Sequence, residues 1–269
     1  GINHTTINAQ SRLTGQVTIT NTETGTLSAS GVASTVLNLR RVEGSVDLTN
    51  AGMITADNSA TETQGGTFGP VIVIESTDTG LSSIEPFGIV NLTNEATGSI
   101  TGAGETIRIS GFEEINVVND GVIARIDGEF DRDNNGLVDL GSRGDISVVN
   151  NGMITGEAVT TATSAQISAI NAFISGSDPS GELSSVSVVN SADGVISVDT
   201  SNGARGVFVR SSSGAAIESI DILNEGTISI SSDGLFNGRS DGIVVDVDVI
   251  EGGSSRIVNT GVLTVEGFE

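Results

Sequence analysis

The sequence has no cysteine, tryptophan, tyrosine or lysine, and it contains only eight phenylalanine and three proline residues among 269. Without cysteine there is no disulfide framework, thiolate metal site or cysteine nucleophile, so stability must come from packing and backbone pairing. No apolar run reaches the roughly 18 residues of a membrane span, and the first ten residues lack the pattern of a signal peptide. The 36 glycines follow no three-residue period, which excludes collagen and argues against long helices.

Basic residues are scarce. All eleven are arginine, against 34 acidic residues, so the formal net charge is −23. Nucleic acid is therefore not an expected partner, because binding the phosphate backbone requires basic surface. Acidity of this size keeps a protein soluble and favours cations as partners. His4, the single histidine, lies near the terminus, and we expect no catalytic residue in the chain.

A short motif occurs eight times: a run of alternating apolar residues ends in asparagine, and glycine follows two or four residues later. The eight asparagines are Asn21, Asn50, Asn94, Asn119, Asn150, Asn190, Asn224 and Asn259. The intervals between them are 29, 44, 25, 31, 40, 34 and 35 residues and average 34. Self-similarity at this spacing is typical of a solenoid.

The residues before each asparagine have the period of a β-strand with one buried face. The second residue before it is aliphatic in all eight motifs, and the third is polar. The asparagine shares the face of the aliphatic residues, so its side chain should point inward where the strand ends. A buried amide needs partners, and we expect the eight asparagines to form a hydrogen-bonded ladder from coil to coil. The following glycine would supply a positive φ where the turn needs one.

Each motif leads into a second short apolar strand, and each complete interval contains a third apolar stretch, such as STVLNL or GVFVRS. We therefore predict an all-β fold, a right-handed parallel β-helix with three short strands per coil and about eight coils. At about 4.8 Å per coil, the rod would be on the order of 40 Å long. An antiparallel sandwich is the competing fold, but it does not require the same motif eight times in one phase.

Residues 1–269 are interpreted as a single β-helix domain, either a fragment of a longer assembly or a subunit that can stack on another. Intervals longer than one coil requires should form protrusions. The longest two, from Asn50 to Asn94 and from Asn150 to Asn190, predict protrusions around residues 57–69 and 175–184. We expect Phe208 to pack inside the helix.

The phrases VVNNGMIT, ILNEGTISI and IVNTGVLTV resemble the repeats of passenger domains in bacterial autotransporters and related large secreted adhesins. The resemblance covers nearly the whole chain, from Val17 to Val265. It implies a right-handed β-helix that is extracellular or on the bacterial cell surface. One departure is the lack of a C-terminal aromatic-girdled barrel, so either that part is missing here or the protein is exported by another route.

The stretch DRDNNGLVD has the spacing of a calcium-binding loop. The candidate ligands are Asp131, Asp133, Asn135, the carbonyl of Leu137, and Asp139, at loop positions 1, 3, 5, 7 and 9. Gly136 occupies position 6, where the loop turns sharply. Over these nine residues the chain resembles thrombospondin type 3 and dockerin repeats. At position 12, Ser142 replaces the bidentate glutamate, so a last ligand would come from Asp127, Glu129, Asp145 or water.

We predict that a calcium ion braces this loop, and the alternative is an acidic solvated loop. Directly after it, residues 143–145 spell Arg-Gly-Asp, the tripeptide read by some integrins. Tripeptides arise by chance, and Asp145 can equally begin the strand DISVVN. We therefore do not expect a receptor role for this tripeptide.

These features favour a non-enzymatic structural or adhesive surface protein, a rigid rod or fibre subunit. It would stack head to tail or continue a longer solenoid, with a host surface or a polysaccharide as a possible ligand. The alternative is a carbohydrate-active β-helix enzyme, a polysaccharide lyase or hydrolase. Carboxylates that converge with one another or with arginine in a groove would favour the enzyme. Scattered acids, as we interpret Asp246 with Asp248 and Glu113 with Glu114, would favour the scaffold.

Overall fold

The computed structural model describes residues 5–10, 13–31, 34–57, 69–76, 88–126, 129–130, 135–160, 166–175, 183–201, 203–212, 214–233 and 239–267. Within these ranges every regular element is a β-strand, and neighbouring strands pair in parallel. No helix in the described part is long and apolar enough to cross a membrane. The sequence prediction of an all-β parallel fold is confirmed.

The strands form three stacks along the rod. The asparagine sheet contains β2 (Val17–Asn21), β5 (Val46–Asn50), β8 (Ile89–Asn94), the second halves of β10 (Ile107–Asn119) and β13 (Asn135–Asn150), β16 (Ser184–Asn190), β19 (Ile217–Asn224) and β22 (Val249–Asn259). The second sheet contains β3 (Thr26–Ser30), β6 (Met53–Asp57), β9 (Ser99–Gly102), β11 (Val122–Arg125), β14 (Met153–Thr160), β17 (Val195–Thr200), β20 (Thr227–Ser232) and β23 (Val262–Glu266), and β12 (Glu129–Phe130) pairs with the end of β14.

The third sheet contains β1 (Thr5–Ala9), β4 (Thr35–Val42), β7 (Ile72–Ser76), the first halves of β10 and β13, β15 (Ile167–Ile174), β18 (Ala204–Ser211) and β21 (Asp241–Asp246). β10 and β13 run through both the third and the asparagine sheets, which therefore form one hydrogen-bonded sheet with a bend. Each coil follows the order third, asparagine, second, and the described strands make eight coils.

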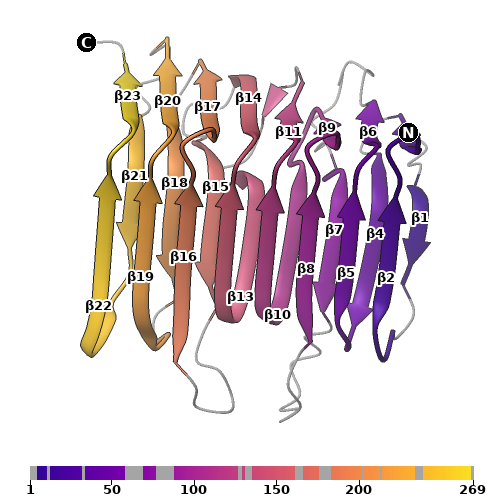
Figure 1. Cartoon of the computed structure of the whole chain (residues 1–269), viewed down its shortest axis with the longest axis horizontal. Helices are drawn as coiled ribbons and strands as arrows, with labels where there is room; N and C mark the ends of the chain where they lie inside the picture. The colour runs from indigo at the N-terminus through magenta and orange to yellow at the C-terminus, as the bar shows by residue number, and fades with distance from the viewer. Residues whose placement is uncertain are drawn as a thin grey trace.

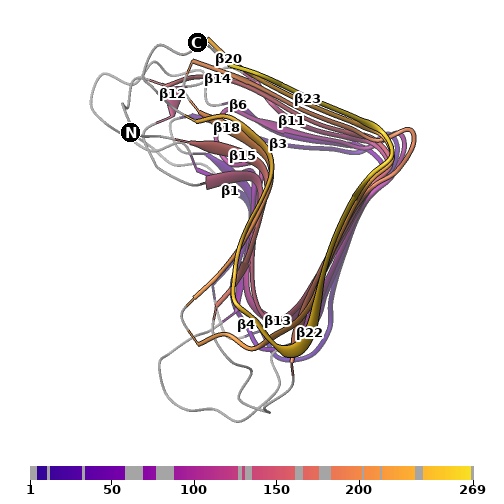
Figure 2. The ribbon, with the colours of Figure 1, turned by 90° about the vertical axis from the view of Figure 1, so that its left-hand side faces the viewer.

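The coils wind in the right-handed sense. Figure 1 shows them side by side along the long axis, from the N-terminal coil on the right to the C-terminal coil on the left. Figure 2 looks along this axis from the C-terminal end. There the chain ascends the asparagine sheet, crosses the second sheet to the left and descends the third sheet. It therefore turns counter-clockwise while it advances toward the viewer, which is right-handed, as parallel crossovers normally are.

Identical aliphatic side chains stack in the interior. The inward column of the second sheet is Ile54, Ile100, Ile123, Ile154, Ile196 and Ile228, all in register and without exposed surface. Burial of each such side chain stabilises the fold by about 1.5–3 kcal/mol. The same column in the last coil holds Leu263, which is 40% exposed because no described coil covers it.

The prediction that Phe208 packs inside the helix is wrong. Val207 and Val209 face the core, and Phe208 between them points to the outer side of the third sheet because strand residues alternate. It is nevertheless buried, beneath arginine side chains. The protrusions predicted around residues 57–69 and 175–184 lie mostly outside the described residues.

Candidate functional site

The first candidate is the asparagine corner, which we define as the eight motif asparagines and the turns that follow them. Seven consecutive hydrogen bonds, each from the Nδ2 of one asparagine to the Oδ1 of the next, join Asn21 to Asn259 at 2.6–2.8 Å. The asparagines pair in register through the whole sheet. Asn21 to Asn224 are buried, so the amides form one shielded chain along the rod.

The amide groups also hold the turns. Nδ2 of Asn150 donates to the carbonyl of Gly152 in its own turn and to that of Val195 in the next coil, both at 3.2 Å. Asn94 and Asn190 make the same pair of contacts in their coils. Each amide thus ties its own turn to the following coil. A buried polar network with its members satisfied is rigid and specific.

The turn glycines are needed for a different reason from the one predicted. None of them has a positive φ; the described glycines with positive φ are Gly15, Gly31, Gly111, Gly214 and Gly252, which lie elsewhere. A Cβ on Gly152 would lie 2.1 Å from the carbonyl oxygen of Gly121 in the preceding coil, and one on Gly226 would lie 2.2 Å from that of Gly194. The glycines are therefore required by the close approach of stacked turns.

The second candidate is the outer face of the third sheet, whose outward residues form two columns in register. They are Asn38, Val73, Arg108, Asp139, Asn171, Phe208 and Val244, and beside them Arg40, Glu75, Ser110, Gly141, Phe173, Arg210 and Asp246. Arginine, carboxylate, amide and phenyl groups thus lie together in a chain that is otherwise strongly acidic. The pattern of eight motifs does not reveal this face, because its residues differ from coil to coil.

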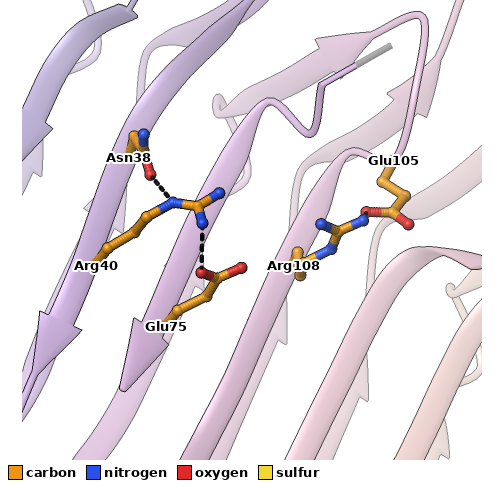
Figure 3. A network of polar contacts seen from close by, with 5 residues as sticks. All are labelled: Asn38, Arg40, Glu75, Glu105 and Arg108. Atoms are coloured by element: carbon orange, nitrogen blue, oxygen red, sulfur yellow. Dashed lines mark hydrogen bonds and ion pairs between the residues drawn. The ribbon is translucent and has the colours of Figure 1, made fainter. Parts of the chain in front are cut away.

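Figure 3 shows the N-terminal part of this face. Nε of Arg40 donates to Oδ1 of Asn38, and Nη1 of Arg40 lies 3.0 Å from Oε2 of Glu75. One coil further, Arg108 forms an ion pair with Glu105. The Arg40 side chain is 46% exposed, so its ion pair contributes little to stability.

The C-terminal part of this face is more buried and contains aromatic rings. Asn171 has no exposed surface; its Nδ2 donates to Oδ1 of Asp139, and its Oδ1 accepts a hydrogen bond from Nε of Arg210. Arg210 lies over the ring of Phe173 at 4.9 Å from the centroid, and Arg205 over that of Phe208 at 4.1 Å. Such contacts each contribute about 0.5–2 kcal/mol.

Burial raises the pKa of Asp139 above its ordinary value. The hydrogen bond from Asn171 and the positive charges of Arg108 and Arg210 oppose this shift but do not cancel it. Asp139 therefore holds its proton to a higher pH than a solvated aspartate does. It is a carboxyl group placed between two arginines on the outside of the rod.

Arg125 is a buried charge that the sequence reasoning missed. It occupies an inward position of β11, and its register partners in the neighbouring coils are Gly102 and Gly156. Burial lowers its pKa to about 10, while the negative charge of Glu105 acts in the opposite direction. Since Glu105 also pairs with Arg108, this buried carboxylate lies between an interior and an outer arginine. The sequence signal was an arginine at an inward position, with glycine at the equivalent position on either side.

The first part of the predicted calcium loop lies outside the described residues. Asp131 and Asp133 lie outside the described residues, and Asn135 is described only as the first residue of β13. The carbonyl of Leu137 accepts a hydrogen bond from the amide of Thr106 at 3.0 Å, and Asp139 is bonded to Asn171. In the described ranges no group of three or more histidine, cysteine or acidic residues is placed to hold a metal. The calcium site remains a prediction.

The tripeptide Arg143-Gly144-Asp145 lies inside β13, not on a loop. A Cβ on Gly144 would lie 2.3 Å from the carbonyl oxygen of Glu113, and the Asp145 carboxylate accepts hydrogen bonds from the amide and hydroxyl of Ser185. The aspartate is thus used within the sheet.

No protein-family model, curated protein or solved structure matches this chain. The two regions described above are the candidates that the structure offers. One of them, the asparagine corner, is uniform and buried. The other, the outer face of the third sheet, is varied and partly accessible.

Proposed function

We propose that this chain is a non-enzymatic structural or adhesive protein, a stiff β-solenoid rod that is extracellular or on a bacterial surface. The observation that carries the proposal is the amide ladder, which runs without a break through all eight coils. A ladder joined to stacked aliphatic columns makes each coil depend on its neighbours, as in other solenoids. Such a rod resists bending, and the hydrogen bonds of its repeated asparagines are made to one another and to the neighbouring turns.

The rod is proposed to extend by stacking, either on a second copy or on further coils of a longer solenoid. The last coil exposes Ile257, Leu263 and Val265, whose column partners in preceding coils are buried. The ladder also has a direction: each Nδ2 donates toward the C-terminal coil, so Asn259 can donate to an incoming asparagine. An uncovered parallel edge favours pairing with another strand.

Electron microscopy of the purified chain tests the rod and its stacking. Filaments or long rods would support stacking between copies, and isolated rods on the order of 40 Å would mean that only coils of the same chain extend it. Compact particles without an axis would contradict the rod itself.

A carbohydrate-active protein is the second candidate, and one observation favours it. Asp139, with its raised pKa, lies among Arg108, Arg210 and Asn171 on an outer face that also carries Phe173. Carboxylate and arginine groups of this kind are what an acid–base site for sugars would use. Incubation with neutral and uronic polysaccharides, followed by an assay for new chain ends, tests it. Products from wild type but not from Asp139→Asn would replace the structural proposal, whereas no products from either protein would support it.

Calcium is proposed as a brace for the loop that begins at Asp131. Calorimetric titration of calcium into wild type and Asp133→Ala tests this, with Asp221→Ala as a control that removes an acid paired with Arg256 on the asparagine sheet. Binding in wild type and the control but not in Asp133→Ala supports the site. Equal heats in wild type and Asp133→Ala would remove it.

A further inference from the structure

On the outer face of the second sheet, two neighbouring columns of outward residues carry no charge. They are Thr26, Met53, Ser99, Val122, Met153, Val195, Thr227 and Val262, and Ser28, Thr55, Thr101, Ala124, Thr155, Ser197, Ser229 and Thr264. We name these sixteen positions the neutral strip.

The neutral strip is also the most regular surface of the rod. The seven pairings that join its eight strands contain no register shift. The other two sheets contain shifts in four described pairings. The side chains of the strip are therefore evenly spaced along the rod, with a repeat of about 4.8 Å. Met53 and Met153 project from it and are 43% and 44% exposed.

Acidic rows border the neutral strip on both sides. On the side of the asparagine corner they are Glu23, Glu95, Asp120, Asp193 and Glu225, all exposed. On the far side, the third outward column of the same second-sheet strands contains Asp57, Glu157, Asp199 and Glu266, which are also exposed. Anionic polymers and anionic membranes are repelled by these rows. The strip itself offers methyl, thioether and hydroxyl groups without such repulsion.

We infer that the neutral strip is a lateral docking surface on which a second copy of this chain packs face to face. A second copy presents the same repeat, so all of its rows can match along the rod. Two β-sheets pack about 10 Å apart with interdigitated side chains, and the methionine and valine side chains have serine and threonine rows to pack between. A two-fold contact of this kind is self-complementary.

The size of the strip sets the strength of the pairing. Eight strands extend about 38 Å, and four residues of each strand about 13 Å. Each copy therefore buries about 500 Å², and the pair about 1,000 Å², which is the lower limit for a specific interface. The pairing is weak and reversible. Because acidic rows face acidic rows at the borders, screening by salt strengthens it.

This inference goes beyond the rod proposed above, since it uses the side of the solenoid and not its ends. Sedimentation of wild type over a concentration series tests it at low and high sodium chloride. We expect a monomer to convert to a dimer as concentration rises, with a Kd at least several-fold lower in high salt. A chain that stays monomeric at every concentration and salt would overturn it.

A charge-matched pair of variants locates the contact. Thr155→Glu combined with Ser197→Glu adds two charges to the middle of the neutral strip and should weaken dimerisation at least tenfold. Ser147→Glu combined with Ser187→Glu adds the same charge to the outer face of the asparagine sheet and should leave it within about twofold. Equal loss in both variants would attribute the effect to net charge and overturn the inference.

Two further measurements separate this contact from end-to-end stacking. Leu263→Glu at the last coil should abolish stacking and leave the lateral dimer intact; the opposite result would support the rod and overturn the lateral contact. The natural absence of cysteine also allows crosslinking without background. Thr155→Cys should form a disulfide-linked dimer under mild oxidation, and Ser187→Cys should not. Equal crosslinking of the two would overturn the assignment even if the glutamate variants fail to fold.

Discussion

The asparagine corner uses the same amide, turn and glycine in every coil, whereas the outer face of the third sheet changes its residues from coil to coil. At the corner, each buried amide is bonded to an identical amide in the coil above and in the coil below. On the outer face, each polar group finds a partner of a different kind in the neighbouring coil, such as Glu75 for Arg40 and Asp139 for the buried Asn171. The inward column of amides therefore requires repetition, and the outer columns permit variation.

The largest expected loss of stability comes from replacing a turn glycine of the asparagine corner. A glycine of the third sheet provides the comparison. Gly152→Ala places a Cβ 2.1 Å from the Gly121 carbonyl oxygen in the adjacent turn, and it should lower the free energy of unfolding by about 3 kcal/mol or more. Gly141→Ala on the third sheet meets only the Ser110 side chain at an ordinary 3.5 Å and should cost less than about 1 kcal/mol. Urea unfolding of both variants measures the difference, and similar losses would mean that close stacking is not what selects glycine at the corner.

Removal of one amide from the ladder should cause the next largest loss of stability. Asn150→Ala leaves Asn119 without its acceptor and Asn190 without its donor, so it should destabilise by roughly 1–3 kcal/mol. Asn151→Ala removes the neighbouring asparagine, whose Nδ2 donates to the exposed Asp120 in the preceding coil, and it should cost about a few tenths of a kcal/mol, as surface changes do. A near-neutral Asn150→Ala in thermal unfolding would contradict the ladder as a source of stability.

The third prediction concerns the pH dependence of stability. We expect opposite signs for an aspartate on the third sheet and an aspartate on the asparagine sheet. Burial raises the pKa of Asp139 in the folded state above its ordinary value of 3.8, so the folded chain holds a proton that the unfolded chain has lost. Wild-type stability from this group therefore increases as the pH falls through that window. Asp139→Asn should raise the Tm at pH 7, and the gain should shrink as the pH falls toward 4.

Asp47, on the outer side of the asparagine sheet, provides the control of opposite sign. Hydrogen bonds from Asn91 and Gln16 lower its pKa below 3.8, so its contribution is present above that pH and is lost as the pH falls through the lowered value. Asp47→Asn should lower the Tm at pH 7 and match wild type in stronger acid. Parallel pH profiles for the two variants would show that the environments do not differ as described.

The smallest expected loss of stability is in the N-terminal part of the third sheet. Arg40→Ala breaks the ion pair with Glu75 and the hydrogen bond to Asn38. Because the Arg40 side chain is 46% exposed, the free energy of unfolding should change by no more than about 0.5 kcal/mol and less in high salt. A loss close to that of Asn150→Ala would mean that the outer face supports the fold as strongly as the corner does.

Much of the fold could be predicted from the sequence because the pattern of apolar and polar residues that specifies it is local and repeated. Alternation before Asn150 and Asn190 places Val148 and Val188 in the core, and the same holds for the motifs that end at Asn50, Asn94, Asn119 and Asn224. Phe208 was misplaced because an aromatic residue between two valines was given the core position that the valines occupy. The turn glycines were assigned to positive φ because the distance between stacked backbones is not visible in one repeat.

The sequence by itself determined the coil period, the inward and outward positions and the ladder residues, because each depends on spacing within one strand or between equivalent strands. Only the tertiary structure decided which unlike residues meet across the structure: Asp139 beside Asn171, Arg210 over Phe173, and Arg125 near Glu105. The intervals between coils vary from 25 to 44 residues. The register that joins residues so far apart therefore arises only when the coils stack and their buried columns align.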